Sequence, residues 1–170
     1  MEHSDKLSPN ELAFIALTNE YCKAIEDCGT YREDFVLSLL KLLPRIYITS
    51  LDLIDNVLEN EDGIGAFLDE SIYDQIRANI SGVMADEDVY LEVFVEDMKY
   101  SDTPISATIS ENLADLYQEF YNFIASVNDA TTSVQRSMIM QCKDDFNAFW
   151  GQTLCNVLRA LHNIHFIKEF

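Results

Sequence analysis

Residues 35–48 read FVLSLLKLLPRIYI, an unusually apolar run in which polar side chains are few. A helix that is apolar on nearly every side is buried inside a protein rather than laid on its surface. We therefore predict that this segment is the central helix of a bundle. Pro44 lies inside it and lacks the amide hydrogen that a helix needs, so we expect a kink or a short break near residues 40–43.

Capping patterns predict where the surrounding helices begin. A Ser or Thr followed three residues later by Glu satisfies two free amide groups at a helix start. This pattern occurs at Ser8–Glu11, Thr30–Glu33 and Thr108–Glu111, and Asp69 is a further candidate cap. The helices expected from these signals and from apolar periodicity span about 12–28, 31–48, 50–59, 70–82, 109–127 and 133–167. The prediction is an all-α bundle of five to seven helices, with residues 1–170 forming one domain.

Two segments are harder to assign. Residues 89–95 have the β-branched and aromatic composition of a strand, but no second strand-like run offers a partner. We therefore expect a short helix or an extended packing segment there, followed by a connector over 99–107. A continuous helix over 133–167 would be about 52 Å long. That length exceeds the diameter of a compact domain of this size, so we expect either an elongated bundle or a break at Gly151.

Negative charge is concentrated in the middle of the chain. The protein has 30 acids and 11 bases, a net charge of −19, and residues 49–103 hold 15 of the acids but only two of the bases. Such a field repels phosphate backbones and anionic lipid, so neither nucleic acid nor a membrane surface is an expected partner. The charge indicates either a solvated face or a docking surface for a basic partner or for cations. The candidate residues of a partner surface are Asp86, Glu87, Asp88 and Glu92.

The ends of the chain and the cysteines indicate a compartment. The first residues, MEHSD, lack the basic and apolar regions of a signal peptide. No uncharged apolar run is long enough to span a bilayer. Four cysteines lie in helical stretches without a CxxC pair, which favours reduced thiols. We therefore expect a cytoplasmic protein.

A few residues have the chemistry of a site. Asp115 and Glu119 share a helix face, and Trp150 precedes a glycine that permits close helix approach. Arg159 and His162 lie further along the same predicted helix as Trp150. Together these five residues form the candidate pocket of a small-ligand or metal-binding protein, or of a helical hydrolase.

His162 and His165 have a spacing that could place two imidazoles on one metal, but no Cys or Glu at a familiar zinc spacing joins them. Carboxylate pairs such as Asp115 and Glu119 could bind a divalent cation, but a chain this acidic contains such pairs by chance. We therefore predict no metal and no cofactor.

Four short stretches resemble a known family. They are LPRIY at 43–47, ENLADLYQE at 111–119, FNAFWG at 146–151 and LRAL at 158–161. They are similar to a family of small bacterial all-helical proteins known only as a domain of unknown function. The resemblance covers nearly the whole chain and implies a helical fold and a bacterial origin, but no activity.

Three hypotheses of function follow. The first is a non-enzymatic interaction or regulatory module that uses the acidic surface of residues 49–103. The second is the pocket around Trp150. The third is a homodimer that joins through the aromatic-rich last helices. An enzyme is the less favoured class.

Overall fold

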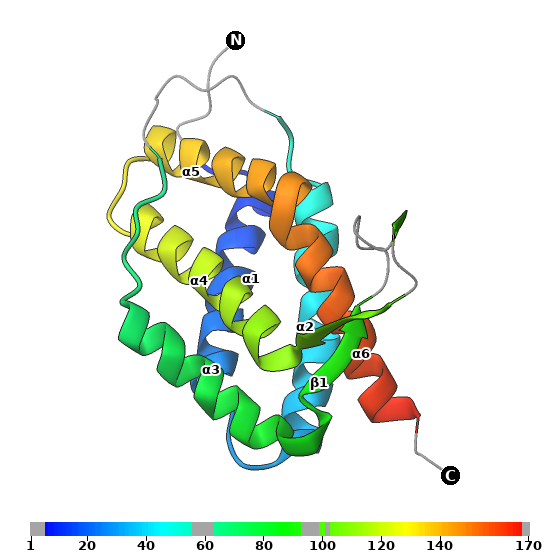
Figure 1. Ribbon diagram of the computed structural model, residues 1–170. Helices are drawn as coiled ribbons and strands as arrows, with labels where there is room; N and C mark the ends of the chain where they lie inside the picture. Colours follow the sequence, from blue (N-terminus) through cyan, green and yellow to red (C-terminus); the bar gives the residue numbers. More distant parts are fainter. Residues whose placement is uncertain (1–5, 56–62, 93–98, 101–102, 168–170) are drawn as a thin grey trace.

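The computed structural model describes residues 6–55, 63–92, 99–100 and 103–167. The described residues form α1 (Pro9–Glu26), α2 (Arg32–Leu51), α3 (Glu70–Met84), the 3-10 turn η1 (Ala85–Glu87), β1 (Val89–Glu92), β2 (Ile105–Thr108), α4 (Ile109–Val127), α5 (Thr132–Asp145), the π-helical turn η3 (Phe146–Trp150) and α6 (Gly151–Phe166). Six α-helices and one two-stranded sheet make an α-helical bundle, as predicted (Figure 1). No helix of these residues is long and apolar enough to cross a membrane.

The helix starts follow the capping signals in three of four cases. Ser8 caps α1 and forms the reciprocal pair with Glu11, while Asp69 caps α3 and Thr108 caps α4. The exception is α2, whose N-cap is Tyr31 without a side-chain hydrogen bond. The N-cap predicted for this helix from Thr30 and Glu33 is therefore wrong by one residue.

The helix with the most helical neighbours is α4, rather than the expected α2. It packs against α1, α3, α5 and α6, whereas α2 packs mainly against α1 and α6 (Figure 1). Aromatic rings fill the contact between α4 and α1, where Phe123 meets Phe14 and Phe120 meets Tyr21 with centroids 5.2 and 5.1 Å apart. The buried Tyr21 hydroxyl donates to the Leu113 carbonyl at 2.8 Å, so this contact leaves no polar atom unpaired.

Helix α2 is less buried than its composition predicts. Leu37, Ile48 and Leu51 are 37%, 59% and 58% exposed along its outer side. The helix continues through Pro44 without a break. It ends at Leu51, so the further helix expected over 50–59 does not begin, and residues 56–62 lie outside the described part of the chain.

The strand-like segment does find a partner, contrary to expectation. β1 pairs antiparallel with β2, with Val89 opposite Thr108 and Glu92 opposite Ile105. The partner strand, β2, has the sequence ISAT, and its last residue, Thr108, is also the N-cap of α4. The strand pattern therefore overlaps the signal for a helix start. Sequence periodicity cannot recognise a strand of four residues in that position.

Asp88 joins β1 to the start of α4. It is 6% exposed, and its two carboxylate oxygens accept hydrogen bonds from the backbone N–H and the hydroxyl of Ser110 at 2.8 and 2.7 Å. Its own carbonyl accepts from the N–H of Ile109 at 2.8 Å. These bonds satisfy amide groups that the first turn of a buried helix cannot pair internally. Asp88 is therefore a structural residue and not part of an exposed acidic surface.

The last predicted helix is divided into α5 and α6 by a π turn that ends directly before Gly151, where one of the two expectations placed a break. The N–H of Gly151 bonds to the carbonyl of Phe146, one residue further back than in an α-helix. The indole N–H of the buried Trp150 donates to the Cys142 carbonyl at 3.0 Å. A β-carbon on Gly151 would lie 2.6 Å from the Phe146 oxygen and 2.8 Å from its ring, so the turn requires glycine at this position.

Replacing Asp88 by alanine should destabilise the fold. The Asp88→Ala variant removes the acceptor of the buried Ser110 N–H and leaves the Ser110 hydroxyl only a longer bond, at 3.4 Å, to the Thr108 hydroxyl. We therefore expect its free energy of unfolding to fall by about 2 kcal/mol. Urea unfolding followed by circular dichroism measures the change. The control is Glu87→Ala, an exposed neighbour with the same charge change, for which we expect less than about 0.5 kcal/mol. Equal losses would contradict the role of Asp88.

Two glycine substitutions should act in opposite directions. The Gly151→Ala variant forces its methyl group against Phe146 and should cost about 1–3 kcal/mol. Gly82→Ala, in α3, meets no atom within 4 Å and should gain about 0.5–1 kcal/mol through helix propensity. Thermal unfolding of both variants tests the pair. An alanine tolerated equally well at both positions would show that the π turn does not depend on Gly151.

Candidate functional site

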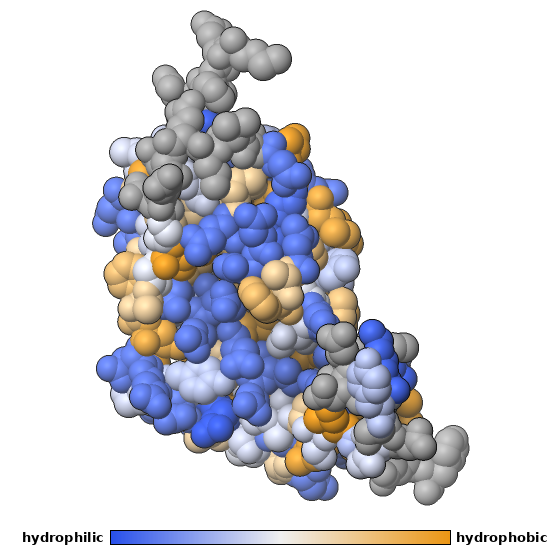
Figure 2. Space-filling view, turned by 45° about the horizontal axis from the view of Figure 1, so that its top comes forward, coloured by the Kyte–Doolittle hydropathy of each residue, from blue (hydrophilic) through white to orange (hydrophobic). Residues whose placement is uncertain are grey.

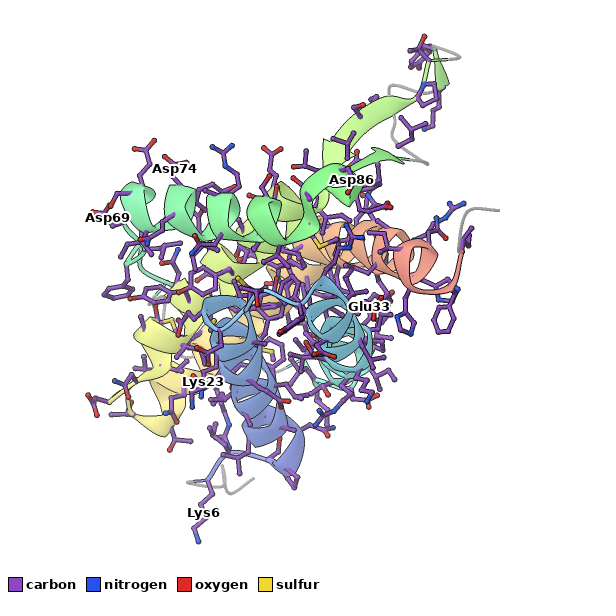
Figure 3. The ribbon with its side chains drawn as sticks, turned by 90° about the horizontal axis from the view of Figure 1, so that it is seen from below. Lys6, Lys23, Glu33, Asp69, Asp74 and Asp86 are labelled. Carbon is purple, nitrogen blue, oxygen red and sulfur yellow. The ribbon has the colours of Figure 1, made fainter. Side chains whose placement is uncertain are left out.

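Exposed acids line α3 and extend onto α4. On α3 and the turns beside it they are Asp69, Glu70, Asp74, Asp86 and Glu87, and on α4 they are Glu111 and Asp115. We call these seven residues the acidic face. Figure 3 shows Asp69 and Asp74 on the outer side of α3, with Asp86 beyond its C-terminal end, and Figure 2 shows hydrophilic residues over the middle of the surface in view.

Two arginines are paired within the acidic face. Arg77 contacts Asp74 at 3.3 Å, and Arg32 contacts Asp86 at 3.3 Å. Both pairs are solvent-exposed, so each contributes little to stability. Asp74 and Asp86 are thus the two acids of the face that pair with these arginines, against seven acids in all. The face therefore remains strongly negative.

The α3 and α4 parts of the acidic face are joined by a hydrogen bond. The hydroxyl of Tyr73 on α3 donates to the Oδ1 atom of Asp115 on α4 at 2.7 Å. Burial and then the Asp115 carboxylate raise the pKa of Tyr73, so the tyrosine stays protonated and keeps donating. Asp69, the N-cap of α3, accepts hydrogen bonds from the hydroxyl and the backbone N–H of Ser71. These bonds, the hydroxyl first, lower the pKa of the Asp69 carboxyl. These contacts position acids of both helices on one surface.

A second acidic group lies where α4 meets α5. Glu119 is half-buried, and burial, then the charge of Asp145 and then that of Asp115 raise its pKa. Burial and then Asp144 raise the pKa of Asp145. The neighbouring Lys143 does not neutralise this group, because its Nζ atom lies 2.6 Å from both the Leu53 carbonyl and Asp55.

The structure separates the predicted partner surface. Asp86 and Glu87 are exposed and belong to the acidic face, whereas Asp88 is buried at the start of α4. Glu92 is half-buried on β1, two residues from Tyr90, and its charge contributes to raising the pKa of that tyrosine after burial itself. A surface defined from the sequence run 86–92 thus contains only two fully exposed acids.

The five predicted pocket residues occupy different surroundings. Asp115 and Glu119 lie near each other on α4. Trp150 is 3% exposed and packs edge-on against Phe120 in the core. His162 is exposed and stacks on Phe166 with centroids 4.6 Å apart. Arg159 lines a pocket that none of the other four residues lines. The contacts of the five residues therefore do not unite them in one cavity.

The pocket beside Arg159 lies between β1 and α6. It has a volume of about 280 Å³ and is lined by Tyr90, Leu91, Asn156, Arg159, Ala160 and Asn163. Sequence reasoning found Arg159 but missed the asparagines and the β1 residues. The asparagines recur with Arg159 at helical spacing, which was a detectable signal, but the approach of β1 depends on the unpredicted strand pairing.

The cysteines and histidines do not gather into a metal centre. Within the described ranges, no three His, Cys, Asp or Glu side chains lie close enough to hold an ion. The four cysteines are free thiols. Burial, followed by the charge of Glu26, raises the pKa of Cys22 to about 12, and burial likewise raises the pKa of Cys142. These two thiols are thus poor nucleophiles at neutral pH.

The aromatic residues proposed for a dimer contact divide into two groups. Phe146 and Trp150 are buried within the chain, where Phe146 also meets Tyr47. Phe149 and Phe166 are 70% and 62% exposed. A homodimer through the last helices would therefore have to use the latter two, and it remains a hypothesis.

Neutralising Glu119 should stabilise the protein at neutral pH. When the pKa of a carboxyl is raised in the folded state, the folded protein becomes less stable as the pH rises above the ordinary pKa of that carboxyl, which for Glu is 4.5. The Glu119→Gln variant removes that loss. We expect a gain of less than about 1 kcal/mol at pH 7, because water screens a half-exposed group. The gain should shrink as the pH is lowered toward 4.5, which urea unfolding across the pH range measures.

Glu111→Gln is the control on the same helix. Glu111 is exposed in the first turn of α4, where a negative charge is favourable, so this variant should be neutral or slightly destabilising. A Glu119→Gln variant that is less stable than the unmodified protein at pH 7 would contradict the assignment of burial and charge repulsion as destabilising the Glu119 carboxylate.

Comparison with known proteins places the chain in a family. The profile of a domain of unknown function, DUF5063, matches residues 5–166. A crystal structure of the protein BF1032 from Bacteroides fragilis is similar, with 28% sequence identity and a TM-score of 0.82 over 95% of this chain and 96% of that one. No functionally curated protein matches. The chain is therefore a member of the DUF5063 family, a bacterial helical fold whose function is unknown.

Proposed function

We propose that this protein is a non-enzymatic interaction module whose acidic face binds a basic segment of a partner protein. The observation that carries the proposal is the composition of that face. Seven acids lie exposed across α3, its flanking turns and α4, and the described bases among them are Arg32 and Arg77. Lysine or arginine side chains of a partner would supply the missing positive charge.

Electrostatics favours such a partner at low cost. Because the acids are exposed, their carboxylates stay partly hydrated on binding, and the desolvation penalty of a buried ion pair does not arise. The net charge of −19 draws a basic partner in from solution, which raises the association rate more than the final affinity. Binding should therefore weaken as ionic strength rises.

The arrangement suits binding better than catalysis. The acids lie exposed on helix surfaces and on the turns beside α3. General acid–base catalysis instead uses carboxyls whose surroundings tune them to the working pH and align them with a substrate. The proposal also includes a cytoplasmic location, which the four free thiols support.

Charge reversal on the acidic face tests the proposal. The variant Glu70→Lys/Asp74→Lys/Glu87→Lys leaves the caps Asp69 and Asp88 intact and should retain the fold. The probe is a fluorescent 20-residue peptide of alternating lysine and alanine, and fluorescence anisotropy at about 0.15 M salt measures its binding. We expect the variant to bind about tenfold more weakly or worse, as several attractive contacts become repulsive.

A second triple variant controls for net charge. Asp27→Lys/Asp34→Lys/Asp52→Lys changes the charge by the same amount at exposed positions beside or within α1 and α2. It should weaken peptide binding by no more than about threefold, through the overall field alone. Equal losses in the two variants would show that the acidic face is not a distinct binding surface and would refute the proposal.

A further inference from the structure

Arg159 differs from the other arginines of the described chain. Arg32, Arg45, Arg77 and Arg136 each lie within 3.6 Å of a carboxylate. Arg159 has no ion pair or hydrogen bond with any residue that the structure describes, although the chain has 30 acids. Its guanidinium group is thus available to an external anion.

Two amide side chains flank this guanidinium group. Asn156 and Asn163 precede and follow Arg159 by one turn of α6, so all three face the same pocket. The structure shows no hydrogen bond from either side-chain amide to a described residue. The pocket thus offers the charged guanidinium group of Arg159 and the neutral amide donors of two asparagines, all from one helix. These N–H donors match the oxygen atoms of a carboxylate.

The opposite wall is apolar and held in place. Tyr90 and Leu91 of β1 line the pocket, together with Ala160 of α6. The Tyr90 hydroxyl donates to the Oδ1 atom of Asn112 at 2.7 Å, which fixes the ring before any ligand arrives. A ligand with an apolar body can therefore pack against this wall while its charged end meets Arg159.

Size and charge narrow the ligand class. The volume of about 280 Å³ is at the small end for ligand pockets and about twice the cavity that accommodates benzene. Glu92 lies two residues from Tyr90, and the net charge of the chain is −19, so a ligand with several negative charges would be repelled. A single negative charge and a compact apolar body satisfy both limits.

We propose that the pocket between β1 and α6 binds a small monocarboxylate whose apolar body contacts Tyr90, Leu91 and Ala160 while its carboxylate pairs with Arg159. This site shares no residue with the acidic face, and the inference does not depend on the function proposed for that face. Polyphosphates and nucleotides are excluded as ligands by their charge.

Binding of a graded set of acids tests the proposal. The probes are acetate, isovalerate, benzoate and indole-3-acetate, titrated into ¹⁵N-labelled full-length protein and followed by NMR. We expect the largest shifts at the side-chain amides of Asn156 and Asn163, with at least one of the larger acids binding with a Kd of about 1 mM or tighter. Benzamide, the neutral isostere of benzoate, should bind about tenfold more weakly.

Variants separate this site from non-specific effects. Arg159→Gln should weaken binding of the tightest-binding acid about tenfold. Arg159→Lys should weaken it less, because lysine keeps the positive charge but cannot donate two parallel hydrogen bonds to a carboxylate. Arg45→Gln, on α2, makes the same charge change at an exposed arginine outside the pocket and should leave binding unchanged. Glu92→Gln should tighten binding, since it removes a nearby negative charge.

Several results would overturn the proposal. They are the absence of shifts at Asn156 and Asn163 with every acid at about 10 mM, equal binding of benzamide and benzoate, and equal effects of Arg159→Gln and Arg45→Gln. Weaker binding in Glu92→Gln would also overturn it, since the proposal treats the Glu92 carboxylate as a charge that repels the ligand.

Discussion

The carboxylate of Asp88 accepts two hydrogen bonds from Ser110 in a place where both residues are almost fully buried. Much of the molecule depends on this contact. It pairs backbone N–H groups in the first turn of α4, the helix that contacts four others. It also anchors the chain at Asp88, between η1 and β1. Because β1 is fixed there, Tyr90 reaches Asn112 one turn into α4, and the opposite wall of the Arg159 pocket acquires its position.

The chain is strongly acidic, but its surface is not uniformly so. The acidic face collects exposed carboxylates on α3 and α4, and the Glu119 and Asp145 group extends negative charge toward α5. The Arg159 pocket offers a positive group beside an apolar wall between β1 and α6. Since the two proposed sites differ in charge, the proposals assign separate surfaces to a basic protein and to a small acid.

Prediction from sequence succeeded where a local signal is sufficient. The caps at Ser8, Asp69 and Thr108 need only neighbouring residues, and each begins a helix as expected. It failed for α2, because apolar composition does not reveal which side of a helix lacks a neighbour, and Ile48 remains exposed. It also failed for β1, whose partner is four residues long and merges with a helix start. The candidate site fared similarly, since Arg159 was identified but its surroundings depend on β1.

The sequence by itself determined the helical class, most helix starts, the family and the strong negative charge, because these follow from local hydrogen bonding, periodicity and composition. Tertiary structure alone decided which acids are exposed and which are used internally. Asp86, Glu87 and Asp88 are consecutive and chemically alike, yet the first two face water and the third is buried. The physical reason is that burial of a carboxylate requires donors from elsewhere in the chain, and Ser110 supplies them 22 residues later.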